Sequence, residues 1–232
     1  MRRLGSSVDI VTHFRSTTIS ALGKRLPGTL WYVWWRAEIY KENFSAQAIA
    51  YASTIEMAVT ILASVIICLL FAIPMITQYQ YSLVGIILLF IISLAAIHPR
   101  LMRWFLKKFG TEAYRIRYRD LLSWIVLYMI IWMLVGVLLF NISNIVTNVS
   151  PEKISYLIGS VAITGILSRL LLFSPSAFGF TEVSLSLLLT GIMPSSIAVI
   201  VALANRIIVT CFEIIWALIS LSVRRITWMK AK

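Results

Sequence analysis

The segment 121–140 reads LLSWIVLYMIIWMLVGVLLF and contains no charged residue. A helix needs about 20 apolar residues to cross a bilayer, so this segment predicts a membrane span. Of the 232 residues, 60% are apolar and only 13% are charged. A soluble domain is about half apolar and about a quarter charged, so these values exclude a soluble globule and a disordered chain. We expect an all-α, polytopic transmembrane helical bundle that forms one integral membrane domain over residues 1–232.

Four further apolar runs surround this segment. They are 57–73, ended by Pro74; 83–97, ended by His98 and Pro99; 154–173, interrupted by Arg169; and 197–223, which contains Arg206 and Glu213. Ionised side chains inside apolar spans are rare because their burial is costly, so they mark pairs, water or a functional site. Arg169, Arg206 and Glu213 are therefore candidates for such roles, and Glu56 at the edge of the first run joins them.

The basic residues indicate the orientation. Segment 98–119 holds seven Arg and Lys residues against Glu112 alone, and the C-terminus adds Arg224, Arg225, Lys230 and Lys232. Cytoplasmic loops are enriched in Arg and Lys, so both segments are expected in the cytoplasm of a cell whose inner or plasma membrane the chain crosses several times. The net charge of +12 then faces anionic lipid, and we expect no nucleic-acid partner.

Two Pro- and Gly-containing segments resemble each other. Segment 22–31, LGKRLPGTLW, contains Pro27 and Gly28; segment 174–182, SPSAFGFTE, contains Pro175 and Gly179. Each precedes a short helical run and then a long helix with a Ser-x-x-Ala start. A shift of 150 residues places Ser45 on Ser195 and Glu56 on Arg206. This order predicts two repeat halves, about 8–74 and 154–223, joined by linker spans over 82–140.

The two halves are expected to have opposite orientations in the membrane. Paired broken segments of this kind indicate an inverted-repeat transporter. The run 181–190 is too short to cross the bilayer, which favours a re-entrant segment over an interfacial loop between full spans. We expect the Pro27 and Pro175 turns to face each other inside the bundle, because lipid cannot satisfy their backbone groups.

The second break suits an anionic headgroup. Thr181 is expected to cap a short helix that begins near Glu182, and a helix N-terminus attracts phosphate. Glu182 would bind an amine or a proton, or would merely favour the first turn of its own helix. Glu56 and Arg206 could pair near a pseudo-two-fold axis, either as a structural ion pair or as ligands of a zwitterionic lipid.

No catalytic constellation is evident. His13 and His98 stand apart from any carboxylate at metal-binding spacing, and the chain has no nucleophile elbow and no phosphate-binding loop. We therefore expect no cofactor, no metal and no catalytic residue.

The singled-out residues resemble the lysylphosphatidylglycerol synthase transmembrane-region family, which includes flippase domains. The resemblance rests on Lys24-Arg25-Leu26-Pro27-Gly28-x-x-Trp31, Arg36-Ala37 and Glu56, and on Pro175 to Glu182, Gly191-Ile192 and Ala202 to Arg206. It covers about residues 20–221, although Pro175-Ser176-Ala177 lacks the double glycine of the family turn. These residues hold no counterpart of the soluble aminoacyl transferase domain, so synthase activity is not implied.

The resemblance implies a non-enzymatic role in moving a phospholipid or a lipid-linked substrate across the bilayer. Its partners would be membrane lipids, anionic or aminoacylated, and the sequence leaves a homo-oligomer open. A membrane-embedded glycosyltransferase-like enzyme and an accessory subunit of a cell-envelope lipid enzyme are the alternatives. The residues expected to line the headgroup cavity are Glu182, Arg206, Thr181, Gly179, Pro175, Glu56, Arg36, Pro27 and Gly28.

The charge distribution makes the topology testable. A single cysteine placed at Arg103, in a chain whose Cys68 and Cys211 are replaced by serine, should resist membrane-impermeant thiol reagents in intact cells. The reason is the Arg and Lys excess of 98–119, which favours the cytoplasmic side. Labelling should occur once the cells are permeabilised. Strong labelling of intact cells would place this segment outside and overturn the orientation.

Overall fold

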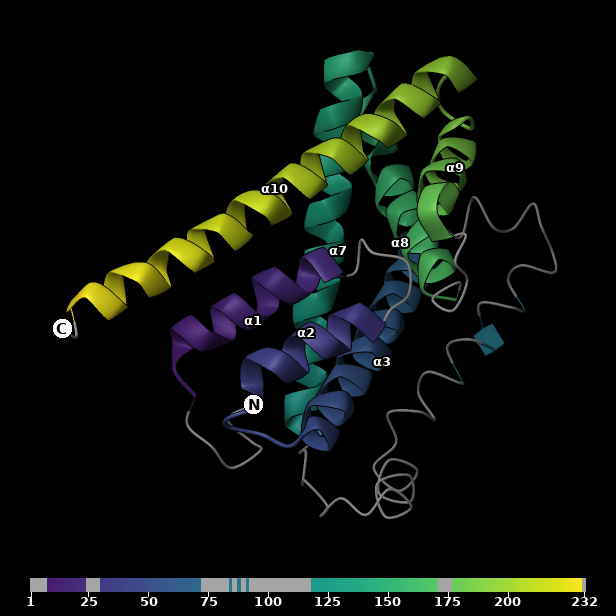
Figure 1. The fold of residues 1–232 in the computed structure, drawn as a ribbon. Helices are drawn as coiled ribbons and strands as arrows, with labels where there is room; N and C mark the ends of the chain where they lie inside the picture. The colour runs from purple at the N-terminus through teal and green to yellow at the C-terminus, as the bar shows by residue number, and fades with distance from the viewer. Residues whose placement is uncertain are drawn as a thin grey trace.

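The computed structural model describes residues 8–23, 30–71, 84, 87, 88, 91, 118–170 and 177–230, and helix is the regular structure throughout these ranges (Figure 1). The elements are α1 Ile10–Gly23, α2 Leu30–Tyr40, α3 Ala46–Phe71, α7 Tyr118–Val146, a short 3-10 turn η2 Pro151–Lys153, α8 Ile154–Leu170, α9 Ala177–Leu189 and α10 Ser195–Lys230. The all-α fold class is confirmed. The Pro27, Gly28 and Pro175 turns, most of the expected span 83–97 and most of the basic segment 98–119 lie outside the described residues.

Among the residues that the structure describes, three helices are long and apolar enough to cross a membrane. They are α3, α7 and the part of α10 from Ser195 to Ser222. Helix α3 begins well before the apolar run that starts at residue 57, because Ser45 of the Ser-x-x-Ala pattern caps it: the Ala48 backbone N–H donates to the Ser45 side-chain oxygen at 3.2 Å. Large apolar side chains stay exposed along α7 and α10, among them Leu122, Leu134, Ile207 and Leu218. Such faces are suited to lipid rather than to water.

Within the described ranges, four other helices are shorter than a membrane span. Helix α8 has 17 residues and α9 has 13, whereas α1 and α2 have 14 and 11. At 1.5 Å per residue, α8 is about 25 Å long, less than the roughly 30 Å hydrocarbon core. The described part of the expected fourth apolar run, 154–170, is therefore shorter than a full span.

The short helices form two hairpins, α1 with α2 and α8 with α9. Each hairpin contacts both α3 and α10. Helix α1 packs on α10, with a hydrogen bond from the Thr18 hydroxyl to the Ser220 hydroxyl at 3.0 Å. Helix α8 packs on α3, where Ile158 and Ala162 share a buried cluster with Ile67. The first helix of each predicted half thus lies against the long helix of the other half.

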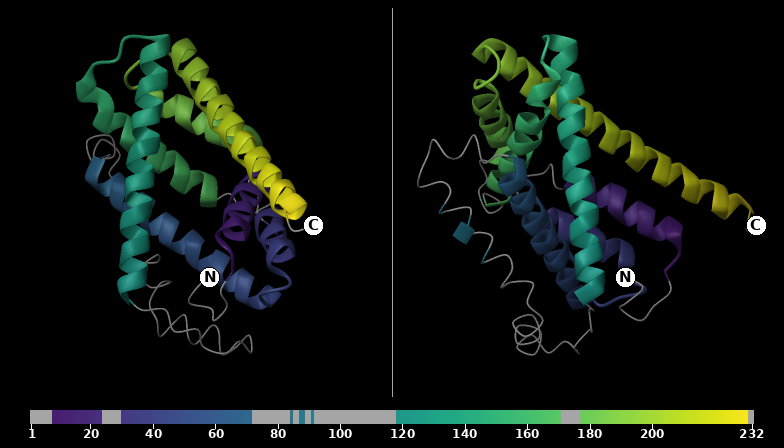
Figure 2. Two further views of the ribbon diagram at one scale, coloured as in Figure 1. Left: turned by 90° about the vertical axis from the view of Figure 1, so that its left-hand side faces the viewer. Right: turned by 180° about the vertical axis from the view of Figure 1, so that it is seen from behind.

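The two long helices of the halves run in opposite senses. Helix α10 begins at the top of Figure 1 and descends to the C-terminus, whereas α3 begins at the bottom and climbs. Figure 2 shows the same relation from two further sides, with α8 and α9 in the upper half of the molecule and α1 and α2 in the lower half. Helix α7 stands between them and packs on both α3 and α8.

A close approach of α7 and α8 depends on a glycine. A Cβ added at Gly136 would lie 2.7 Å from the Cα of Ile158, nearer than real Cβ contacts allow. Small residues of this kind let membrane helices pack backbone to backbone. The contact holds α8 against the α7 span.

Gly136→Ala should therefore destabilise the fold. Alanine normally favours a helix by up to about 1 kcal/mol over glycine, but overpacking against a backbone costs about 1–3 kcal/mol. The melting temperature of the purified protein in detergent should fall, whereas Leu134→Ala on the exposed face of α7, where the side chain is 62% exposed, should change it little. An unchanged or raised melting temperature for Gly136→Ala would contradict this packing.

Candidate functional site

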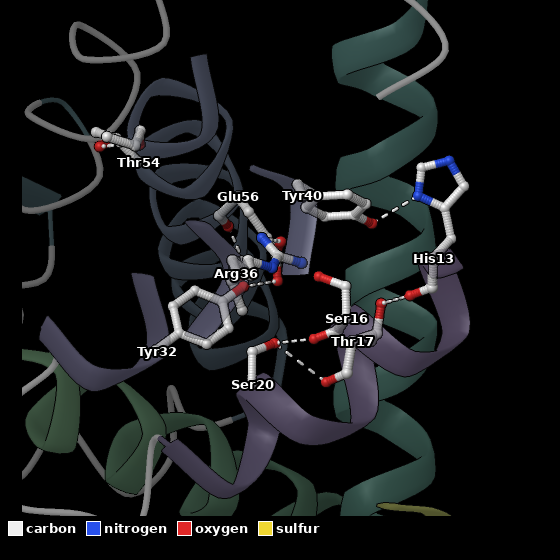
Figure 3. Close-up of polar contacts among 11 residues, drawn as sticks. His13, Ser16, Thr17, Ser20, Tyr32, Arg36, Tyr40, Thr54 and Glu56 are labelled. Atoms are coloured by element: carbon white, nitrogen blue, oxygen red, sulfur yellow. Dashed lines mark hydrogen bonds and ion pairs between the residues drawn. The ribbon is translucent and has the colours of Figure 1, made fainter. Parts of the chain in front are cut away.

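A buried ion pair joins the short helix α2 to the long helix α3. The Arg36 Nη1 lies 2.5 Å from the Glu56 Oε2, with the two side chains 10% and 26% exposed. The Tyr32 hydroxyl donates to the other carboxylate oxygen, Oε1, at 2.7 Å. The Arg36 guanidinium lies 4.7 Å from the centre of the Tyr32 ring. Tyr32 and Arg36 are one helical turn apart, so α2 presents both to Glu56 (Figure 3).

Helix α1 adds a polar face to this cluster. Ser16 and Ser20 are fully buried, and the Ser20 hydroxyl donates to the Ser16 carbonyl oxygen at 2.5 Å. The His13 ring nitrogen Nδ1 lies 2.6 Å from the Tyr40 hydroxyl oxygen. Figure 3 shows the Ser16 side chain directed toward Arg36. We call the residues His13, Ser16, Ser20, Tyr32, Arg36, Tyr40 and Glu56 the first-half cluster.

The sequence prediction covered Arg36 and Glu56 but missed the rest of the first-half cluster. The signal was the spacing of small and polar residues on one face of α1, because His13, Ser16 and Ser20 recur every three to four residues. The prediction treated His13 as isolated, since its partner Tyr40 lies 27 residues away in the chain.

A second ion pair joins α9 to α10. The Arg206 Nε lies 3.1 Å from the Glu182 Oε1, and the two side chains are 27% and 15% exposed. Beside them, Leu185 of α9 and Ala202 of α10 belong to one buried apolar cluster. The structure thus brings together two residues that the sequence singled out, on helices that pack directly against each other.

The charged residues of the two long helices, Glu56 and Arg206, occupy equivalent places. The shift of 150 residues that places Glu56 on Arg206 also places Tyr32 on Glu182. Each contact, Tyr32 to Glu56 and Glu182 to Arg206, therefore links the same position of a short helix to the same position of the following long helix. The charges are reversed, because the long helix carries the acid in the first half and the base in the second.

Two details differ from the sequence expectation. Helix α9 begins at Ala177, so Thr181 lies inside it and does not cap a helix that starts near Glu182. Gly179, which was expected in the break before the helix, lies within the helix and has φ +90°, a conformation that glycine adopts at no steric cost. The structure pairs Glu56 with Arg36 and Arg206 with Glu182, whereas the sequence suggested that Glu56 and Arg206 could pair with each other.

Arg169 in α8 is held by a hydrogen bond within its own helix and by an aromatic ring on α7. Its Nη1 donates to the Gly165 carbonyl oxygen at 3.0 Å, and its guanidinium lies 5.1 Å from the centre of the Trp132 ring on α7. A cation above an aromatic face is stabilised where water is scarce. These contacts explain how an arginine is tolerated in this apolar helix, and they tie α8 to α7.

The first-half ion pair can be tested against the exposed Glu38–Lys41 pair at the end of α2. Arg36→Gln and Glu56→Gln should each lower the free energy of unfolding by about 3–5 kcal/mol, because each leaves a buried charge without its partner. The double variant should lose less than the sum of the single losses, as measured by denaturant unfolding in detergent.

Glu38→Gln is the matched control. It breaks the contact between Glu38, whose side chain is 47% exposed, and Lys41, whose side chain is 62% exposed. The hydrogen bond to Glu38 raises the pKa of the Lys41 amine, but so exposed a pair contributes little to stability. Equal losses for Glu38→Gln and Glu56→Gln, or strictly additive losses for the Arg36 and Glu56 variants, would refute a stabilising buried pair.

Neither a metal-binding group nor a match to a known protein was found for these residues. Within the described ranges, no group of three or more His, Cys, Asp and Glu side chains is placed to hold a metal ion. Comparisons of the chain with protein-family models, with curated proteins and with solved structures found no match.

Proposed function

We propose that the chain is a cell-membrane protein that handles phospholipids by flippase-like translocation of a headgroup across the bilayer. The observation that carries this proposal is that Glu56 and Arg206, at equivalent positions of α3 and α10, each form an ion pair with a residue of a short helix, Arg36 and Glu182 respectively. Ionised residues among apolar helices are costly and typically mark substrate paths. This role agrees with the resemblance to the lysylphosphatidylglycerol synthase transmembrane-region family.

An inverted repeat is part of the proposal. It is supported by the shared order of short helix, turn and long helix in α2–α3 and α9–α10, and by the opposite senses of α3 and α10 (Figures 1 and 2). It is also supported by the exchange of hairpins, since α1 packs on α10 and α8 packs on α3. Transporters built in this way bind their substrate between the repeats and move one against the other.

The hairpins α1–α2 and α8–α9 would then be re-entrant. Their helices have 11 to 17 residues, so each is about 17–25 Å long and cannot cross the bilayer alone. Polar backbone at membrane depth needs protein or water around it, which a headgroup path would provide. In this arrangement the basic segments 98–119 and 224–232 lie in the cytoplasm.

The second ion pair suits a headgroup that carries a phosphate. Arginine offers a planar fork of N–H donors that matches phosphate oxygens. Glu182 is acidic and lies beside it, so an anionic lipid with a cationic substituent would find both charges complemented. Aminoacylated and zwitterionic phospholipids have this combination, whereas plain anionic lipids lack the cationic group.

Substitution of either charge should slow lipid movement. Reconstituted vesicles with fluorescent lipids report translocation by the loss of fluorescence that an external quencher produces. Glu182→Gln and Arg206→Ala should each lower the rate about tenfold or more, since a hydrogen bond to a charged group contributes about 1.5–3 kcal/mol. Glu152→Gln, at an exposed acid in η2, is the matched control and should leave the rate unchanged.

Correct insertion of each variant is checked by its melting temperature and its elution as a single species. Normal translocation by both folded variants would exclude the Glu182–Arg206 site. Vesicles with the natural protein that move no lipid faster than empty vesicles would refute the flippase-like function itself.

A further inference from the structure

Two buried oxygen atoms near the second ion pair have no hydrogen-bond donor. They are the Glu182 Oε2, the carboxylate oxygen that does not face the Arg206 Nε, and the Asn205 side-chain oxygen. An amide oxygen and an ionised carboxylate oxygen only accept hydrogen bonds. Buried acceptors without donors are destabilising. These two oxygens therefore indicate a place where a donor group binds.

The two residues that carry these oxygens lie beside the contact between α9 and α10. Glu182 precedes Leu185 by three residues, and Asn205 follows Ala202 by three residues; Leu185 and Ala202 lie in one buried cluster. Residues three apart share a helix face, so the two polar side chains lie on the faces by which α9 and α10 meet. Arg206, which follows Asn205 in the chain, contacts Glu182 directly at 3.1 Å, which sets both residues at the same level.

We propose that Glu182 and Asn205 together select lipid headgroups that carry N–H or O–H donors, and that Asn205 is a further specificity-determining residue. This inference rests on the proposed lipid-handling function and names its substrate class. A primary ammonium offers three N–H donors and a glycerol hydroxyl offers one O–H donor, whereas the trimethylammonium group of choline offers none. The site therefore prefers an ethanolamine headgroup to a choline headgroup, although the two have the same phosphate and the same net charge.

The two headgroups provide a matched test. The purified full chain in detergent is titrated with short-chain phosphatidylethanolamine or phosphatidylcholine, and the shift in melting temperature gives the affinity. The ethanolamine lipid should bind about three- to tenfold more tightly, as one hydrogen bond implies. Asn205→Leu should reduce this ratio to about twofold or less and leave the affinity for the choline lipid unchanged.

Two further variants show whether a lost preference reflects the headgroup site or a general effect on the fold. Glu182→Gln, which removes the charge with little change in size, should also reduce the preference for ethanolamine. Asn141→Leu replaces an exposed amide on α7 and should retain the full preference. A preference that survives both Asn205→Leu and Glu182→Gln would overturn the inference, as would equal binding of the two lipids by the natural chain.

The outcomes distinguish this inference from the proposed function. Translocation of lipids without any preference for ethanolamine over choline would overturn donor selection and leave the flippase-like role standing. A clear preference in binding without translocation would support donor selection and refute flipping. Binding of soluble phosphoethanolamine but not of the lipid would overturn the assignment of a lipid headgroup.

Discussion

The burial of charge among apolar helices is the constraint on which this structure depends. A lone Arg or Glu in such surroundings would be costly, and two contacts between a short and a long helix meet this constraint. Arg36 pairs with Glu56 across α2 and α3, and Glu182 pairs with Arg206 across α9 and α10. These contacts fix each short helix at one height along its long partner, which apolar packing alone would specify less strictly.

Sequence patterns predicted the parts of the fold that depend on short-range chemistry. Apolar length identified α7, and the Ser-x-x-Ala pattern identified the start of α3, where Ser45 accepts a hydrogen bond from the Ala48 N–H. The Glu182–Arg206 contact follows from two antiparallel helices joined by a tight turn. The contact between Thr18 and Ser220 could not be predicted, because 202 residues separate them and neither residue carries a distinctive pattern.

The errors at the site have physical causes as well. Gly179 was interpreted as a break before a helix capped by Thr181, yet the chain is helical from Ala177 and accommodates the positive φ of Gly179 within α9. The partner of Glu56 was sought in the other half, because a shift of 150 residues equates it with Arg206. The structure shows a nearer base, Arg36, which α2 presents to Glu56 one turn beyond Tyr32.

Each hairpin contacts both long helices, so its ion pair connects movements of α3 with movements of α10. Helix α1 is held to α10 by the Thr18–Ser220 hydrogen bond, and the same hairpin is held to α3 by Arg36–Glu56. Any movement of α3 relative to α10 therefore acts on the Arg36–Glu56 contact. The second hairpin repeats this relation, since α8 packs on α3 and α9 is held to α10 by Glu182–Arg206. Under the proposed function, a headgroup that competes for one of these charges would loosen one hairpin from its own long helix, while the packing of that hairpin on the other long helix stays intact. Binding and movement of the halves would in this way be coupled through the same few side chains.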